Sequence, residues 1–513
     1  MENLCVCQGF SRGFQNLYLA SCLKKSGTYL MYNPNVLLIV SEDNGPHLGC
    51  YGDLFVDTPH LDQLAAEGIR FSNAYTTQAV CSPARASILT GLYPHQNGQI
   101  GLATHKYAMF PAHAVEENLP NIPSLLKANG YRTGLIGKLH INPESEFPFD
   151  LWWNDPSSIS FANRDMQKTA QVAEKFVTES NTPFFLMVNY PDAHLPFHRQ
   201  QFGLPKVPYE AEDVETLPFV GVDTPRLRAQ TADYYNCISR LDTGVGLLLD
   251  RLQQSGKANN TVVIFTTDHG AQFSRGKTAI YESGLKIPFI LRWPSINSES
   301  LVKDELISHV DVLSTIMEVT GTDCPDSVAG KSLVPLIQES PVCWREYLFA
   351  EWCSAHPPIY FPQRSVRDQK FKLILNLLQD RPSPSAIGYS GESSFGSWEP
   401  GASVAEIASA DKQIRKVYQT YKNPPAEELY DLENDPWEFN NLAGLPKYEA
   451  EQHRLRDQLR SWQESTKDAL LNPAHLNRLT EEHNTIVAEY YQESAWGKSR
   501  AYEWCYAKYL SQH

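Results

Sequence analysis

Short, unbroken apolar runs that end in polar residues limit what this chain can fold into. Residues 36–40 (VLLIV) form the first such run. Comparable runs recur at residues 133–136, 184–190, 262–267 and 288–293. A strand buried on both faces of a parallel sheet has this pattern, and helical periodicity separates the runs. The alternation predicts an α/β sandwich with a mostly parallel sheet, and chemistry is expected just beyond the ends of its strands.

Helix-capping residues mark several helices between these runs. Thr58 and Pro59 are suited to start a helix that continues to about residue 68. Further helices are expected at residues 120–129, 226–252 and 309–319. Gly130 and Gly321 follow two of them, at positions that tolerate a left-handed backbone.

The pattern changes near Pro341. Short strands are expected at 347–351, 371–376 and 428–432, around a Ser/Gly/Pro-rich stretch at 381–403. The expected organisation has four parts. They are an N-terminal extension (1–30) without an expected structural role, an α/β domain (31–344), a smaller C-terminal α+β domain (345–470) and a helical tail (471–513). Met31 precedes the first strand, and we expect it to be a better natural start than Met1.

Composition excludes several classes of protein. With 59 acidic and 44 basic residues the net charge is −15, which argues against nucleic acid as the main partner. The apolar runs are far shorter than the roughly 20 residues that span a bilayer, so no integral membrane segment is predicted. The first 30 residues lack the apolar core of a signal peptide, which leaves both cytoplasm and periplasm open. The ten cysteines are too scattered for a disulfide framework.

The segment Cys81-Ser82-Pro83-Ala84-Arg85, which leads to Gly91, carries the most chemical information. Pro83 is suited to the first turn of a helix, so Cys81 is expected at a helix N-terminus. Free backbone N–H groups there favour an anion. The interpretation is a nucleophile or anion site, and a lone cysteine in this place could instead be buried and structural.

This segment resembles the C-x-P-x-R signature of the type I sulfatases, and Thr90-Gly91 and Gly101 fit the same family. The similarity covers roughly residues 33–465. The resemblance implies an alkaline-phosphatase-like sandwich. It also implies that a formylglycine-generating or other sulfatase-maturing enzyme oxidises Cys81 to formylglycine. The activity implied is sulfate hydrolysis from a sulfated carbohydrate.

The resemblance also implies a Ca²⁺ site. Glu42 and Asp43 follow the first strand where the family places two aspartates, and Asp268 and His269 match the second metal pair. A hard divalent cation takes oxygen ligands, some of which substrate can supply. Glu42 departs from the aspartate that is usual in the family. Its longer side chain either alters the coordination of the metal or leaves Asp43 as the principal ligand of this pair.

Four more residues match catalytic positions of the family. Lys138 and His140 lie in a G-K-x-H element, His194 follows another strand, and Lys277 matches the basic residue that holds sulfate from the other side. With Arg85 they are expected to form a cationic pocket. The resemblance implies that Lys138 contacts sulfate and residue 81, that His140 contacts the hydroxyl of residue 81, and that His194 protonates the leaving group.

Within the family the chain resembles the sulfamidase-like members most. Three segments carry this likeness, at residues 95–98, 240–246 and 364–366. Asp192, His356 and Arg364 are the expected substrate-binding residues. Lys277 replaces the arginine that is usual in that group, and together with Glu42 it leaves N-sulfo and O-sulfo specificity both open.

Two other functions remain open at this stage. One is a phosphatase or phosphonate monoester hydrolase of the same superfamily, since the same metal and nucleophile serve phosphorus. The other is a glycan-binding protein in which Cys81 is never oxidised and no reaction is catalysed.

Overall fold

The first predicted apolar run forms the centre of the large sheet. In the computed structural model, the structure describes residues 33–110, 119–296, 300–394 and 400–491. Strand β1 (Asn35–Ser41) is buried along its whole length. Leu37 and Ile39 point into one hydrophobic core, and the alternate residues Val36, Leu38 and Val40 point into a second core. A strand with apolar neighbours on both faces explains the unbroken apolar run.

The large sheet is mostly parallel, as predicted. Its order is β4-β3-β5-β1-β6-β7-β2-β8, and β9 pairs with β2. The other strands of this sheet are β2 (Ile69–Tyr75), β3 (Arg132–Ile136), β4 (Leu151–Trp153), β5 (Phe184–Asn189), β6 (Thr261–Thr267), β7 (Lys286–Arg292), β8 (Leu301–Lys303) and β9 (Ile307–Ser308). Only the pairings of β7 with β6 and with β2 are antiparallel within this described sheet.

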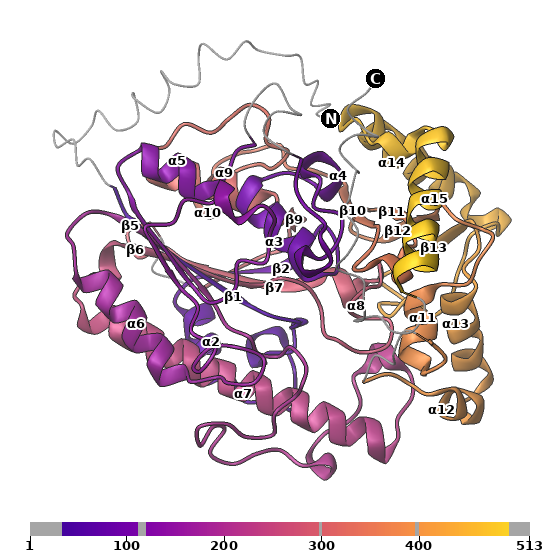
Figure 1. Cartoon of the computed structure of the whole chain (residues 1–513), viewed down its shortest axis with the longest axis horizontal. Helices are drawn as coiled ribbons and strands as arrows, with labels where there is room; N and C mark the ends of the chain where they lie inside the picture. Colours follow the sequence, from indigo (N-terminus) through magenta and orange to yellow (C-terminus); the bar gives the residue numbers. More distant parts are fainter. Residues whose placement is uncertain (1–32, 111–118, 297–299, 395–399, 492–513) are drawn as a thin grey trace, which may run out of the picture. The chain divides into compact units, whose positions relative to one another are not determined.

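Helices cover both faces of this sheet (Figure 1). One face packs against α2 (Pro59–Ala66), α6 (Met166–Thr178) and α7 (Pro225–Gln254). The other packs against α3 (Cys81–Thr90), α5 (Ile122–Ala128), α9 (Asp311–Thr320) and α10 (Val334–Ile337). The helices expected from capping residues are present, with ends that differ by a few residues.

A second, antiparallel sheet follows in the C-terminal part of the chain. Its strands, in spatial order, are β10 (Leu348–Trp352), β11 (Gln363–Arg367), β12 (Phe371–Asn376) and β13 (Glu427–Asp431). Helix α14 (Glu449–Ser465) packs on it through Leu455, Leu459 and Trp462. The remaining helices of this part are α11 (Pro384–Ser390), α12 (Val404–Ser409), α13 (Lys412–Lys422) and α15 (Pro473–Tyr490). The Ser/Gly/Pro-rich stretch therefore contains a helix.

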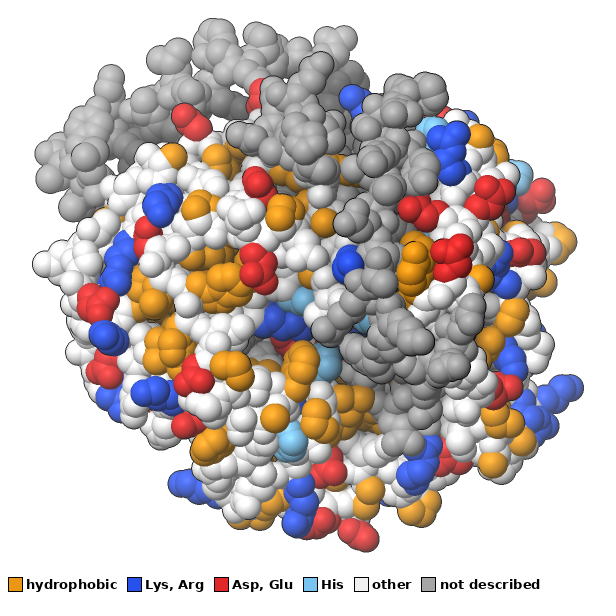
Figure 2. All heavy atoms as spheres, viewed as in Figure 1, with side chains coloured by type: hydrophobic (Ala, Val, Ile, Leu, Met, Phe, Trp, Pro, Cys, Tyr) orange, Lys and Arg blue, Asp and Glu red, His pale blue; other side chains and the backbone are white. Residues whose placement is uncertain are grey.

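Some expectations fall outside the described residues. The N-terminal extension 1–30 lies there, as does the end of the helical tail beyond residue 491. Among the described residues, no helix combines the length and the apolar character needed to cross a membrane. Figure 2 shows acidic and basic side chains interspersed over the visible face.

Candidate active site

The carboxyl ends of β1 and β6 bring together two pairs of ionisable residues from distant parts of the sequence. The strands are parallel neighbours, and their last residues lie opposite each other. Glu42 and Asp43 follow β1, and Asp268 and His269 follow β6. The Asp43 backbone N–H donates to Asp268 Oδ1 over 3.0 Å, and all four residues are buried.

Cys81 lies at the predicted helix N-terminus. Helix α3 begins at Cys81, preceded by an extended Val80, and ends before Gly91, which has a φ of 68°. The Cys81 side chain is buried, with Sγ 3.6 Å from His269 Nε2. The prediction that Pro83 lies in the first turn is confirmed.

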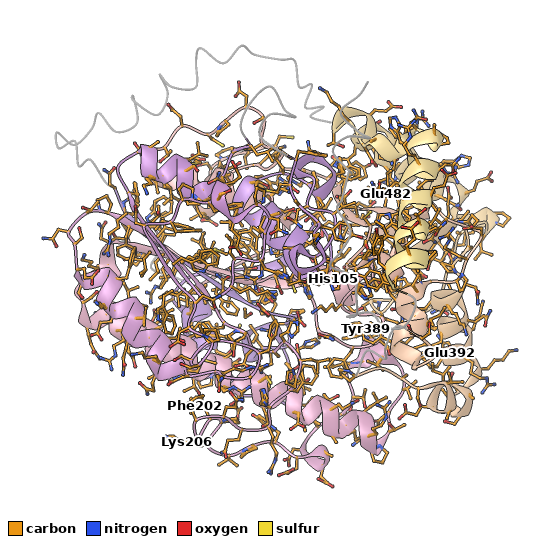
Figure 3. The ribbon with its side chains drawn as sticks, viewed as in Figure 1. His105, Phe202, Lys206, Tyr389, Glu392 and Glu482 are labelled. Atoms are coloured by element: carbon orange, nitrogen blue, oxygen red, sulfur yellow. The ribbon has the colours of Figure 1, made fainter. Side chains whose placement is uncertain are left out.

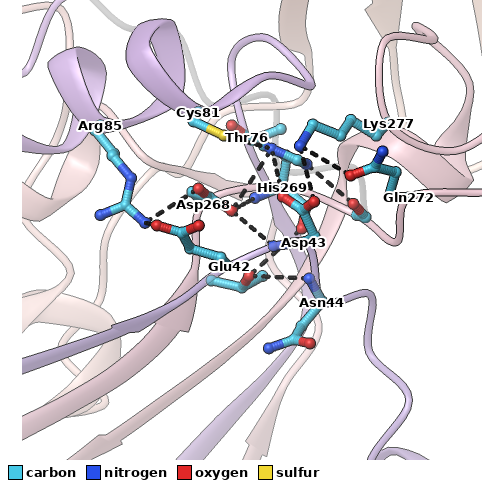
Figure 4. Close-up of polar contacts among 12 residues, drawn as sticks. Glu42, Asp43, Asn44, Thr76, Cys81, Arg85, Asp268, His269, Gln272 and Lys277 are labelled. Carbon is cyan, nitrogen blue, oxygen red and sulfur yellow. Dashed lines mark hydrogen bonds and ion pairs between the residues drawn. The ribbon is translucent and has the colours of Figure 1, made fainter. Parts of the chain in front are cut away.

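Four donor atoms form a compact group at this point (Figure 4). One ligand atom from each of Asp43, Cys81, Asp268 and His269 lies within 4.8 Å of the others. His269 Nδ1 donates to the Gly270 carbonyl over 2.9 Å, which directs its Nε2 toward the group. The buried Asp43 Oδ1 accepts no hydrogen bond from any described residue. A cation would occupy the open Asp43 oxygen and replace the proton on His269 Nε2, so the residues fit a metal. We call these four residues the donor cluster.

Arg85, one turn along α3, crosses between the acidic residues. Its guanidinium donates to Glu42 and Asp268, both over 3.1 Å, and to Asn189 Oδ1 over 2.7 Å. Burial acts to lower the pKa of Arg85, but the charges of Asp268 and Glu42 outweigh it and raise the pKa. The guanidinium therefore stays charged although it is fully buried.

Glu42 lies among cations, outside the donor cluster. Its carboxylate contacts Arg85 and, at 3.2 Å, the Lys138 ammonium group. Lys138 is partly exposed, and its Nζ lies 5.0 Å from the centre of the Phe161 ring. In this arrangement Glu42 holds two basic side chains beside the cluster, and the metal role expected for it stays a prediction.

Lys277 reaches the cluster from the side opposite Arg85 (Figure 4). Its Nζ is 2.8 Å from Asp43 Oδ2 and 3.3 Å from Gln272 Oε1. Burial acts to lower the pKa of Lys277, and the Asp43 charge more than reverses this effect. Positive charge therefore flanks the donor cluster on two sides.

The charges inside the donor cluster are strongly coupled. Burial acts to lower the pKa of His269, but Asp268 and Asp43 raise this pKa to about 9. Burial acts to raise the pKa of Asp268, and the charges of His269 and Arg85 hold it below its usual range. A cation would compete with the proton on His269 for the same carboxylates.

His140 follows β3 and lies close to the basic side chains. Its Nε2 is 3.5 Å from Thr104 Oγ1. Burial, followed by the charges of Lys138 and Arg85, lowers the pKa of His140 well below its ordinary value. The ring is therefore neutral around pH 7.

His194 is also neutral in the free protein. Its Nδ1 lies 2.6 Å from the Leu195 carbonyl oxygen, which can only accept, so Nδ1 carries the hydrogen. The ring stacks on Phe161 with centroids 4.0 Å apart. Burial and the charges of Lys277 and Lys138 lower the pKa of His194 well below 6.5.

Asp192 anchors the loop that carries His194. It is fully buried between Arg164 and Arg240, with oxygen–nitrogen distances of 2.5 to 3.0 Å. Arg164 also donates to the His194 carbonyl over 2.5 Å. We call Asp192, Arg164 and Arg240 the anchor cluster. This geometry supports a positioning role, and substrate binding by Asp192 stays a prediction.

The other two predicted substrate-binding residues lie near the C-terminal sheet. Arg364 on β11 forms a two-pronged ion pair with Asp468, at 2.7 and 2.8 Å, and lies 3.5 Å from Glu351. His356 is buried, with its ring 5.2 Å from that of His105. His105 lies on the side of the α/β sandwich next to the C-terminal helices (Figure 3).

Sequence reasoning missed several residues of the site. Asn189, which binds Arg85, was detectable as a polar residue at the end of an apolar run. Gln272, which contacts Lys277, and Phe161, which stacks on His194, lie in irregular segments without a periodic pattern. Arg164 and Arg240 lie far from Asp192 in sequence, and their pairing needs the fold.

Comparison with known families gives two matches. A model of the sulfatase family, "Sulfatase", matches residues 34–322. A second model, "N-sulphoglucosamine sulphohydrolase, C-terminal", matches residues 270–381. The first covers more than half of the chain and contains every residue of the donor cluster.

Characterised proteins give similar matches. The chain is 32% identical to human N-sulphoglucosamine sulphohydrolase, over 85% of this chain and 90% of that protein. It is 31% identical to an ulvan-active sulfatase of Formosa agariphila, over 88% and 84%. A phosphonate monoester hydrolase of Agrobacterium radiobacter shares the fold with a TM-score of 0.62 at 20% identity, over 84% and 96%. The alkaline-phosphatase-like architecture is confirmed.

Proposed function

The chain belongs to the sulfatase family of sulfate ester and sulfamate hydrolases, and from that membership we propose that it removes sulfate from a sulfated glycan. The proposal includes a formylglycine formed from Cys81 by a sulfatase-maturing enzyme, and a bound Ca²⁺. The observation that carries it is the position of Cys81 at a helix N-terminus, inside a buried donor cluster that basic side chains flank.

Asp43, Asp268, His269 and residue 81 would hold the cation. Ca²⁺ prefers oxygen ligands, and the sulfur of an unmodified Cys81 is a poor one. Oxidation of Cys81 to a hydrated aldehyde exchanges this sulfur for oxygen, which improves the fit. When present, the cation would supply positive charge beside sulfate, and the hydrated aldehyde would supply the attacking oxygen.

Three basic side chains suit the negative charge of sulfate. Arg85 and Lys138 approach from one side, and Lys277 approaches from the other. Because they are held by buried carboxylates before substrate arrives, they need little rearrangement to stabilise charge in the transition state. Lys138, the most exposed of the three, is the first to meet an incoming sulfate.

His194 is the proposed acid for the leaving group. Its Nδ1 hydrogen is engaged with Leu195, so only a protonated Nε2 can donate to the departing oxygen or nitrogen. A bound sulfate adds negative charge nearby, which raises the pKa of the imidazole and favours this protonation. Substrate binding and proton uptake are therefore linked. His140, neutral near pH 7, is suited to accept a proton from the hydroxyl of residue 81.

The substrate class we propose is a sulfated glycan. The two relatives reported above are named for an N-sulfo sugar and for a sulfated polysaccharide, and their identities to this chain, 32% and 31%, differ little. The assay below therefore includes both N-sulfo and O-sulfo sugars. An aryl phosphate belongs in the same panel, because a phosphonate monoester hydrolase shares the fold.

The test is sulfate release by protein co-expressed with a formylglycine-generating enzyme. Its panel holds N-sulfoglucosamine, O-sulfated sugars and an aryl phosphate. Cys81→Ala is the inactive variant, and Cys324→Ala, which removes an exposed cysteine, is the matched control. We expect sulfate release that Cys81→Ala abolishes and Cys324→Ala retains.

Mass spectrometry of the peptide that contains residue 81 completes this experiment. Loss of the thiol sulfur together with sulfate release supports the proposal. Preferred hydrolysis of the phosphate would support the phosphatase alternative. An unmodified thiol in protein from the native host, together with glycan binding and no release, would leave a binding protein.

A further inference from the structure

A second cavity, of about 650 Å³, lies outside the donor cluster and is called the basic groove below. Its walls come from the loop after β1, from β2 and β7, and from the loops after β11 and β13. None of the residues to which we assign catalysis or cation binding lines it. The groove is therefore a separate candidate binding site.

Two basic side chains in the groove lack an acidic partner. Arg70 on β2 and Lys286 on β7 form no ion pair within 4 Å with a carboxylate of the described residues. Lys286 Nζ has one long contact, 3.4 Å to Asn73 Oδ1. Burial lowers the pKa of Lys286, and the charges of Arg367 and Arg70 add to this effect against that of Glu282. An anion would relieve this repulsion.

The carboxylates of the groove are already engaged. Glu282 pairs with Arg367 at 2.5 Å, and it also binds a lysine of β12. Asp53 accepts the Tyr235 hydroxyl and two backbone N–H groups, and Glu433 pairs with a lysine outside the groove. Arg70 and Lys286 therefore remain the basic side chains of the groove that form no ion pair with a described carboxylate.

Aromatic rings stand beside these cations. The Tyr51 hydroxyl is fixed by hydrogen bonds to the backbone of β2 and β7, and the Arg70 guanidinium lies 4.9 Å from its ring centre. Trp437, 37% exposed, lies at 6.3 Å from Phe219 between ring centres. A rigid aromatic wall next to charged donors suits a ligand with one apolar face and one anionic group.

We propose that the basic groove binds an anionic sugar unit of the glycan chain, away from the unit that is hydrolysed. This inference rests on the proposed function for the choice of a glycan. The loop after β1 links the two sites, because Glu42 and Asp43 lie at its start while Pro46 and His47 line the groove. The shared ligand chemistry is a sulfate or a carboxylate group on a pyranose ring, which Arg70 and Lys286 contact.

The test uses the double variant Arg70→Gln/Lys286→Gln in the Cys81→Ala chain, which cannot turn over substrate. Calorimetry measures binding of a sulfated oligosaccharide, a non-sulfated uronic acid oligosaccharide and inorganic sulfate. The matched control, Lys168→Gln/Arg460→Gln, removes two exposed charges elsewhere. We expect the double variant to bind the sulfated or the carboxylated chain about tenfold more weakly, and the control to change binding less than twofold.

Loss of affinity for only one oligosaccharide identifies sulfate or carboxylate as the recognised group. Equal affinity of the double variant and its parent for both oligosaccharides overturns the proposal. Weaker binding of inorganic sulfate, with unchanged binding of both oligosaccharides, also overturns the proposal, because the groove then binds a free anion and no sugar.

Hydrogen exchange on the parent Cys81→Ala chain tests the groove without altering it. Added oligosaccharide should slow exchange of the backbone N–H groups of residues 52–55, 433–435 and 437, and unchanged exchange there overturns the proposal. In the catalytically active chain, the double variant should lose kcat/KM on the oligosaccharide and keep it on a sulfated monosaccharide. If no sulfate is released from any substrate, the proposed hydrolysis fails, whereas the binding results still decide the groove.

Discussion

The donor cluster and the anchor cluster are both buried and ionic, but they differ in what remains unbonded. In the anchor cluster, both oxygens of Asp192 accept hydrogen bonds from arginine side chains. In the donor cluster, Asp43 Oδ1 accepts none, although His269 Nε2 lies only 3.2 Å away. Burial and charge alone therefore do not separate a reactive site from a structural one.

The difference has an energetic meaning. A buried charge costs several kcal/mol unless partners compensate it. Two arginine side chains compensate the charge of Asp192, and these contacts fix the backbone of the loop that carries His194. The donor cluster leaves acceptor capacity open toward a single point, where a ligand can supply the missing compensation. An open carboxylate oxygen beside Cys81 thus distinguishes the donor cluster from the anchor cluster, where the buried atom without a hydrogen bond is the donor Arg164 Nε.

Removal of the proposed nucleophile should have the largest effect of the variants that test this comparison. In Cys81→Ala we expect sulfate release to fall by on the order of 10⁴-fold or more, because no other group can form the attacking oxygen. The free energy of unfolding should change by only about 1 kcal/mol. Activity assays and denaturant titration measure the two quantities. A large loss of stability would place Cys81 among the structural residues.

Asp192→Asn should show the opposite balance. It leaves Arg164 and Arg240 buried without full compensation, so we expect the free energy of unfolding to fall by about 3–5 kcal/mol. Cation affinity of the folded fraction should stay within a few-fold of that of the parent chain. Denaturant titration and calorimetry distinguish these effects. An unchanged unfolding transition would remove the basis for an anchor cluster.

Glu42→Asp tests whether a buried carboxylate outside both clusters positions the basic side chains beside the donor cluster. The shorter side chain withdraws from Arg85 and Lys138, which Glu42 contacts at 3.1 and 3.2 Å. We expect kcat/KM to fall about tenfold, because Lys138 loses its carboxylate partner and Arg85 loses one of its two. Glu144→Asp, at an exposed glutamate, is the control. An unchanged kcat/KM in Glu42→Asp would mean that the contacts with Arg85 and Lys138 do not position these cations.

Phe161→Ala should give the smallest change, a shift in pH dependence. The stacked ring contributes to the burial that lowers the pKa of His194, so its removal raises this pKa toward 6.5. If protonated His194 is the acid, kcat/KM declines as pH rises through the His194 pKa. The variant should then lose kcat/KM at a higher pH than the parent chain. Identical pH profiles would contradict the assignment of His194.

The sequence predicted the strands whose neighbours are uniformly apolar, and it predicted less elsewhere. Strand β2 mixes buried and partly exposed residues, and β4 and β8 have only three residues each. None of these three strands therefore shows a continuous apolar run. Strand β11 was not predicted, because it buries Arg364 and Arg367 as ion pairs with acidic residues far away in the sequence. Periodicity does not detect a strand that is buried through salt bridges.

The site was predictable mainly through the resemblance to the sulfatase signature, which singled out its residues. Glu42, Asp43, Asp268 and His269 directly follow β1 and β6, where chemistry was expected, and Cys81 starts a helix, as expected. The partners of these residues depend on tertiary structure. No local pattern indicates that Glu42 turns toward Arg85 and Lys138, or that Asp192 meets two arginines from α7 and from the segment before α6.

Calcium titration of the matured chain, after chelation, tests most directly whether the open acceptors form a cation site. Calorimetry on the parent chain, on Asp43→Asn and on the exposed-acid control Asp223→Asn gives the affinities. We predict one Ca²⁺ per chain, an affinity at least about 100-fold lower in Asp43→Asn, and no change in Asp223→Asn. Absence of binding to the matured parent chain, or equal affinity in Asp43→Asn, would contradict the account.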